Sequence, residues 1–166
     1  MFNARMILVW VWLAMVALSF VEAYVEGRHP WNRRKVGWKL RLGKANNTKW
    51  KKVVDDSIMI KPAETHIFSG YHFFLFVIEL PILISLPLII YGWNFELFGI
   101  LVSAYFSGMV IEDFVYFLVN PAIKFSNWNE RFVSFFSWVR VGNFKVPINY
   151  ITGILIALLS WYFIWR

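Results

Sequence analysis

Four long stretches of this 166-residue chain contain no lysine or arginine. Each is close to the length of about 20 apolar residues that an α-helix needs to cross a bilayer. The composition agrees, because only 16% of the residues are charged, against about 25% in a soluble domain. We therefore expect an all-α membrane protein, a polytopic bundle of four transmembrane helices forming a single domain over residues 1–166. The stretches are residues 6–24, 67–93, 95–119 and 148–165.

The basic residues lie mainly in the two connections that four spans place on one side of the membrane. Residues 25–66 carry 11 of the 17 Lys and Arg residues and residues 120–147 carry four, which leaves Arg5 and Arg166 for the other side. Cytoplasmic loops are enriched in Lys and Arg, so we expect a cell-membrane protein with both loops in the cytoplasm and both termini outside. Residues 6–24 could instead be a cleaved signal peptide, but the basic segment that follows favours a retained helix.

The first connection combines its basic residues with tryptophans. This pattern occurs in nucleic-acid-binding segments, and also where a cytoplasmic loop lies on anionic lipid headgroups. We favour the lipid surface and expect no nucleic acid partner, because nothing else in the chain points to one. In the second connection, we expect the aromatic-rich residues 125–138 to form an interfacial amphipathic helix. The candidate headgroup contacts are Arg33, Arg34, Lys35, Lys39 and Arg41.

Ionisable residues inside the spans are the strongest indication of function. A charge at the bilayer centre costs about 2.5–3.5 kcal/mol on insertion scales, so such residues are usually functional. The spans contain no Lys or Arg, so each carboxylate must be protonated, bind a cation, meet a histidine or be reached by a loop arginine. The helical rise places most of these residues at one depth in the cytoplasmic half, with Glu79 deeper. The candidate metal or proton site comprises Glu22, Glu26, His29, His72, Glu79, Glu112 and Asp113.

Spacing groups these residues further. His72 and Glu79 are seven positions apart and would share one helix face, whereas the neighbours Glu112 and Asp113 lie about 100° apart. One of those two should face the bundle, and the other a neighbouring helix or a loop arginine. The Glu-x-x-His spacing of residues 26–29 is typical of di-iron carboxylate bundles, but one such pair is an incomplete ligand set. A purely structural role for these polar residues stays open.

Several short motifs follow one another along the chain. They are Glu26-Gly27 with Trp31, Ser69-Gly70-Tyr71-His72, Ile78-Glu79-Leu80-Pro81, Glu112-Asp113-Phe114 running to Asn120-Pro121, and Trp138 with Pro147 and Tyr150. In these motifs, over most of residues 21–150, the chain resembles a family of small, functionally uncharacterised prokaryotic integral membrane proteins. The resemblance implies a membrane protein but supplies no reaction. The chain departs from the family pattern where Glu79 and Val139 replace histidines; glutamate keeps a candidate metal ligand, and valine removes one.

Two main functional hypotheses follow. The first is a metal- or proton-handling site, with Fe, Zn or Cu as the candidate metal, that acts on a lipid or membrane-soluble substrate. The second is a non-catalytic accessory subunit of a larger membrane complex, or an assembly of the chain with itself. A proton or ion path is a third interpretation. No HExxH, GxSxG or P-loop motif is present, and the lack of cysteine excludes disulfides and thiol nucleophiles, so whether the protein is an enzyme stays open.

Overall fold

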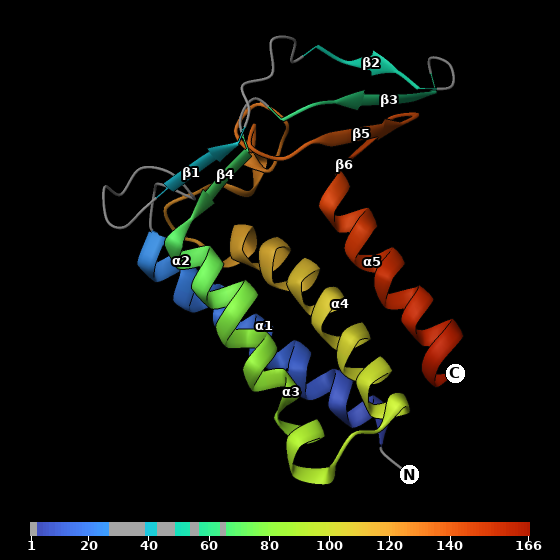
Figure 1. Ribbon diagram of the computed structural model, residues 1–166. Helices are drawn as coiled ribbons and strands as arrows, with labels where there is room; N and C mark the ends of the chain where they lie inside the picture. Colours follow the sequence, from blue (N-terminus) through green and yellow to red (C-terminus); the bar gives the residue numbers. More distant parts are fainter. Residues whose placement is uncertain (1–2, 27–38, 43–48, 54–56, 64–65) are drawn as a thin grey trace.

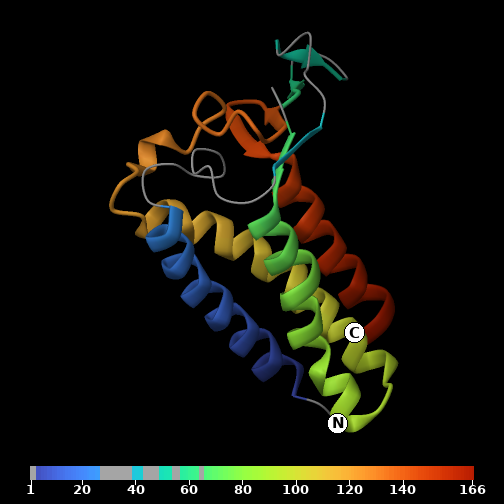
Figure 2. The same ribbon diagram turned by 60° about the vertical axis from the view of Figure 1, so that its left-hand side comes forward.

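Four helices are long and apolar enough to cross a membrane, as the charge-free stretches predict. They belong to a computed structural model that describes residues 3–26, 39–42, 49–53, 57–63 and 66–166. The helices run alternately up and down, so both chain termini lie towards the end of the bundle opposite the strands (Figures 1 and 2). This arrangement indicates a multi-pass membrane protein. The spans are Ala4–Val25, Gly70–Tyr91, Phe95–Val119 and Ile148–Trp165.

Two of the four spans change helix type along their length. In the second span a π-helical segment lies between two α-helical segments, and the fourth span ends in a π-helical segment. The second span begins at Gly70, three residues later than predicted, because residues 67–69 belong to a strand. It ends where Gly92 adopts a φ of 83°, a conformation that glycine tolerates. The helices are α1 (Ala4–Glu26), α2 (Gly70–His72), η1 (Phe73–Glu79), α3 (Leu80–Tyr91), α4 (Phe95–Val119), α5 (Ile148–Ser160) and η3 (Trp161–Trp165).

α4 is the central helix of the bundle, and each of the other spans packs on it. In its most apolar stretch 44% of the residues are buried, against 22% or less in the corresponding stretches of the other spans. Glycines allow this close packing: a Cβ added to Gly108 would lie 2.9 Å from Met15 Cγ, and one added to Gly153 would lie 2.8 Å from Val110 Cγ2. Hydroxyl and indole groups also bond other spans to α4: Trp12 to Ser107, Ser19 to the Glu112 carbonyl, Ser160 to the Gly99 carbonyl, and Trp165 to Ser103.

The π-helical segment leaves one carbonyl that needs a donor from another span. In a π-helix each N–H bonds to the carbonyl five residues earlier, and Leu80 follows this rule by donating to Leu75. The next residue is Pro81, which has no N–H to offer the carbonyl of Phe76. The hydroxyl of Tyr105, in α4, donates to that carbonyl oxygen instead. The proline therefore explains why the second span is bonded to α4 at the carbonyl of Phe76.

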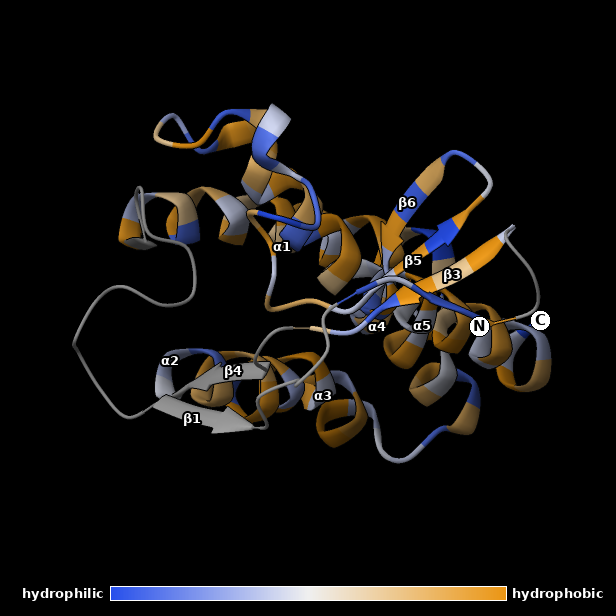
Figure 3. Ribbon diagram, turned by 90° about the horizontal axis from the view of Figure 1, so that it is seen from above, coloured by the Kyte–Doolittle hydropathy of each residue, from blue (hydrophilic) through white to orange (hydrophobic). Residues whose placement is uncertain are grey.

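In the part of the chain that the structure describes, six strands cover the end of the bundle remote from the chain termini. β2, β3, β5 and β6 form an antiparallel sheet in that order, in which Val139 pairs with Ile60 on one side and Val146 on the other. β1 and β4 form a separate antiparallel pair. Seen from above, β5 and β6 mix apolar and hydrophilic residues, whereas the helices are mainly apolar (Figure 3). The strands are β1 (Lys39–Leu42), β2 (Lys51–Lys52), β3 (Ile58–Lys61), β4 (His66–Ser69), β5 (Trp138–Val141) and β6 (Phe144–Pro147).

Two expectations about the connections are wrong. The fold is mostly helical but not all-α, because a small antiparallel sheet is present. Residues 125–138 do not form an interfacial helix; they contain one short 3-10 helix, η2 (Phe125–Asn127), followed by turns and the start of β5. The side chain of Asn129 accepts hydrogen bonds from the backbone N–H groups of Arg131 and Phe132. Such local bonds compete with helix formation.

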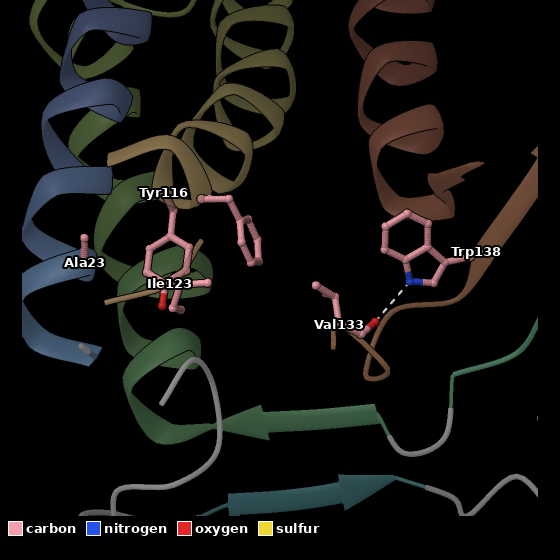
Figure 4. Close-up of a cluster of buried hydrophobic side chains, with 6 residues drawn as sticks. Ala23, Tyr116, Ile123, Val133 and Trp138 are labelled. Atoms are coloured by element: carbon pink, nitrogen blue, oxygen red, sulfur yellow. Dashed lines mark hydrogen bonds between the residues drawn. The ribbon is translucent and has the colours of Figure 1, made fainter. Parts of the chain in front are cut away.

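A buried hydrophobic group, here called the junction cluster, joins the sheet to the bundle (Figure 4). Its largest member, Trp138 of β5, is 1% exposed and donates its indole N–H to the carbonyl of Val133 at 3.0 Å. Because side chains alternate along a strand, Val139 points to the opposite face of the sheet from Trp138. The junction cluster consists of Ala23, Tyr116, Phe117, Ile123, Val133 and Trp138.

The bond between η1 and α4 predicts a dependence on residue 81. We expect Tyr105→Phe to destabilise the protein by about 0.6–1.7 kcal/mol, the span from average to maximum for hydrogen bonds between transmembrane helices. In a Pro81→Ala background residue 81 regains an N–H for the Phe76 carbonyl, so the same substitution should cost less. Unfolding free energies of the four proteins in detergent give the coupling directly. Equal costs in both backgrounds would show that the proline does not create the need for the hydroxyl.

An ion pair beneath the sheet predicts a pH dependence. Lys145 Nζ lies 2.5 Å from Glu130 Oε1. Partial burial raises the pKa of Glu130, but the hydrogen bond and charge of Lys145 outweigh it, so the pKa falls below its ordinary value of 4.5. A lowered pKa stabilises the folded state at higher pH, and this contribution is lost as pH falls through the folded-state pKa. At neutral pH the free energy of unfolding of the wild type should exceed that of Glu130→Gln by at most about 1 kcal/mol.

Thermal melts of both proteins from about pH 3 to about pH 7 test this expectation. The difference between them should shrink towards the acid end of this range. A difference that stays constant across the range would contradict it.

Candidate functional site

Four of the predicted site residues lie at the strand end of the bundle, where α1 and α4 end and α2 begins. Glu22 comes from α1, His72 from α2, and Glu112 and Asp113 from α4. The four residues are between 2% and 9% exposed. The sequence predicts that three helices bring these residues to a similar depth. In the described structure the four residues lie at the same end of the bundle.

His72 and Glu22 face each other between the first two spans. The distance from His72 Nε2 to Glu22 Oε1 is 3.9 Å, which is longer than a direct hydrogen bond. The imidazole stacks on Phe76, with ring centroids 6.0 Å apart, and meets the edge of Tyr71 at 5.1 Å. These contacts hold the ring in place. Either the imidazole or the carboxyl group can carry a proton beside the other.

Asp113 and Glu112 both line one cavity, and each bonds to a different neighbouring helix, Asp113 through its side chain and Glu112 through its backbone carbonyl. The hydroxyl of Tyr150, near the start of α5, donates to Asp113 Oδ2. On the other side of α4, the hydroxyl of Ser19 in α1 donates to the backbone carbonyl of Glu112 at 2.8 Å. The end of α4 is therefore bonded to α1 and to α5. Tyr150, which is 6% exposed, completes the group that we call the polar cluster: Glu22, His72, Glu112, Asp113 and Tyr150.

Sequence reasoning did not place Tyr150 or Ser19 in the site. Tyr150 appears in the motif with Pro147. A tyrosine is uncharged and costs little free energy to place in a membrane, so its presence in a span does not by itself indicate a site. The signal in the sequence is its position, since it is the third residue of a mainly apolar helix and lies beside the junction with the sheet. A buried phenol normally needs a hydrogen-bond partner, and the search for one leads to Asp113.

A cavity of about 550 Å³ lies between η1, α4 and α5. Its polar end is lined by His72, Glu112, Asp113 and Tyr150. Phe135 and Phe136, from the connection after α4, also line it. The rest is mainly apolar and extends along α4 as far as Tyr105, about 10 Å from Glu112 at the helical rise. The other apolar lining includes Phe76, Val77, Phe106, Met109, Val110 and Ile156.

The prediction that His72 and Glu79 share one helix face is wrong. Glu79 is exposed and lines a different space, a groove of about 660 Å³ between α1 and α3. The reason is the π-helical segment between the two residues. Its bonds reach five residues rather than four, so seven residues no longer complete two turns.

Other predicted site residues fall outside the described part of the chain. This holds for His29, for the side chain of Glu26 and for the side chains of the headgroup candidates Arg33, Arg34, Lys35, Lys39 and Arg41. Val139, where the family pattern has a histidine, pairs within the sheet and is not among the residues lining the cavity. Asn120 accepts a hydrogen bond from the backbone N–H of Ala122, so its motif ends α4 and has a structural role.

Within the described residues, no group of three or more His, Cys, Asp or Glu side chains could hold a metal ion. The polar cluster instead contains one hydrogen-bonded pair, Tyr150 with Asp113, and an imidazole, His72, whose Nε2 lies 3.9 Å from Glu22 Oε1. Imidazole, carboxylate and phenol are the groups that proteins use for acid–base chemistry. Proton exchange is therefore the chemistry that these side chains fit best, and metal binding stays a prediction.

No protein-family model, curated protein or solved structure matches the chain. The family resemblance described above therefore stays a prediction. The function has to be argued from the polar cluster and the cavity.

The contact between α4 and α5 predicts unequal effects of two conservative substitutions. Tyr150→Phe removes the donor from a buried acceptor, so we expect a loss of about 0.6–1.7 kcal/mol. Asp113→Asn keeps an oxygen that can accept the phenol proton, so its cost should be smaller. Thermal unfolding in detergent measures both, with Tyr91→Phe, 72% exposed, as the control. A larger loss for Asp113→Asn than for Tyr150→Phe would show that the phenol is not the main contact of this carboxyl group.

Proposed function

We propose that this protein binds a membrane-soluble amphiphile between η1 and α5 and exchanges protons with its head group. The observation that carries the proposal is the cavity itself, which has acid–base side chains at one end and an apolar lining over the rest of its length. Ligand sites typically combine a mainly apolar wall with a few converging polar groups. An uncharged head group beside Asp113 with its chain alongside Met109 and Ile156 would match both parts.

The packing of the spans supports entry from the side. Among the described helices, α5 packs directly on α4, whereas the second span packs on α4 through α3 and is bonded to it at η1 by Tyr105, and η1 and α5 pack little on each other. The space between them is the cavity, so a lipid-soluble molecule could reach it without leaving the bilayer. In the orientation expected from the basic connections, the head group would lie in the cytoplasmic half of the membrane.

The chemistry that we propose is general acid–base catalysis or proton relay. Asp113 is the acceptor for a proton on the head group, and Tyr150 is the donor that returns one. His72 also lines the cavity and lies 3.9 Å from Glu22, and its imidazole is a second group that can hold a proton. Positioned acids and bases typically contribute 10²–10⁴-fold to a reaction, estimated as an order of magnitude (about 3–5 kcal/mol).

A photoreactive long-chain alcohol in liposomes tests the binding site. The expected cross-links lie on cavity residues such as Phe76, Met109 and Ile156. Filling the cavity with Ile156→Trp should lower this labelling about tenfold, which corresponds to 1.4 kcal/mol of binding energy. Ile154→Trp is the matched control, because Ile154 lies on the same helix but is 48% exposed.

The same experiment has outcomes that would overturn the proposal. Labelling spread evenly over exposed residues, or equal labelling of the two tryptophan variants, would mean that the cavity holds no amphiphile. The proton-handling part has its own readout, the infrared band of the protonated carboxyl group, which should shift on alcohol binding and be lost in Asp113→Asn. Stoichiometric Fe, Zn or Cu in the purified protein, removed together with binding by a chelator, would favour the metal-site version instead.

A second candidate function is that of a non-catalytic accessory subunit in a membrane complex. The exposure of the second span favours this function, because only 6% of the residues in its most apolar stretch are buried. Ile89, Ile90 and Tyr91 are each more than 70% exposed, so this span offers a broad apolar face. Native mass analysis after gentle solubilisation distinguishes the candidates, since a lone monomer would disfavour the subunit.

A further inference from the structure

Glu79 lies in the membrane-spanning part of the chain but outside the cavity. It is the tenth of the 22 residues in the span Gly70–Tyr91, and it is exposed. No hydrogen bond or ion pair from the described residues reaches its carboxyl group. An ionisable side chain near mid-membrane is costly and usually marks a functional contact. The question is therefore what covers Glu79 in the membrane.

The groove around Glu79 has the dimensions of a helix-binding surface. Its volume is about 660 Å³, its walls are α1 and α3 with the end of η1, and Leu101 of α4 also lines it. From Leu75 to Pro87 it extends about 18 Å along the span at the helical rise. Among the described helices, α1 and α3 pack on α4 rather than extensively on each other. Ala14 and Ala17 lie on the α1 wall, and small residues of this kind let helix backbones approach closely.

Charge decides between the candidate occupants. An acyl chain would fill the apolar groove but would leave Glu79 either ionised without a counter-charge or protonated without a partner. A second copy of this chain would also lack one, because the four predicted spans contain no lysine or arginine. We infer that the groove binds a transmembrane helix of a different protein that carries a Lys or Arg near its middle. The groove is separate from the cavity, so this inference does not depend on the proposed amphiphile.

The lack of cysteine allows a direct test. An acceptor dye is attached to Arg166→Cys, a residue exposed at the chain terminus. Energy transfer in liposomes is then measured from donor-labelled synthetic Leu/Ala helices with either Lys or Leu at the central position. We expect the Lys helix to associate about tenfold more tightly than the Leu helix. Glu79→Gln should remove this preference, whereas Glu96→Gln, in the first turn of α4, should leave it intact.

Three results would overturn the inference. The first is equal association of the Lys and Leu helices with the wild type. The second is a Lys preference that survives Glu79→Gln while melting curves show that the variant is folded. The third is energy transfer between copies of this chain that depends on Glu79 and is abolished by Ala17→Trp, which would make the occupant a second copy.

Discussion

A polar group within a bilayer must be satisfied inside the protein, and in this chain α4 supplies most of the partners. Tyr105 of α4 bonds to η1, Asp113 accepts from α5, and the Glu112 carbonyl accepts from α1. Because the other spans pack mainly on this one helix, they leave space between one another. The cavity beside α5 and the groove beside α1 are the two spaces that result. The fold thus creates two surfaces of different chemistry on either side of the second span.

The spans could be predicted from sequence because length and apolar composition are sufficient to define them. Phe95–Val119 and the end of the fourth span agree with the prediction to the residue. The sheet was missed because basic and aromatic residues in the connections were interpreted as membrane contacts. A local signal existed, since Gly142-Asn143 between two short β-branched segments is a two-residue hairpin pattern, and Gly142 indeed adopts a φ of 57°. The pairing of β3 with β5 is a long-range contact that no local pattern encodes.

The candidate site was partly predictable for a related reason. Depth along a helix follows from counting residues, so Glu22, His72, Glu112 and Asp113 could be placed at one level. Direction around a helix follows only if the helix type is known, and there the expectation for Glu79 failed. Tyr150 was missed because a phenol costs little in a membrane, although it donates to Asp113. The residues found by energetic cost and those found by geometry are therefore different members of one cluster.

The π-helical segment η1 rotates the side chains that follow it around the helix axis, relative to the positions they would have in a continuous α-helix. Its wider turn leaves His72 on the cavity side and carries Glu79 round to the α1 side. Shortening the segment by a single residue would turn everything beyond it by about 100°. The two acid-bearing surfaces would then no longer face opposite neighbours. The wider helical turn thus keeps the cavity beside His72 and the groove beside Glu79 on different faces of the second span.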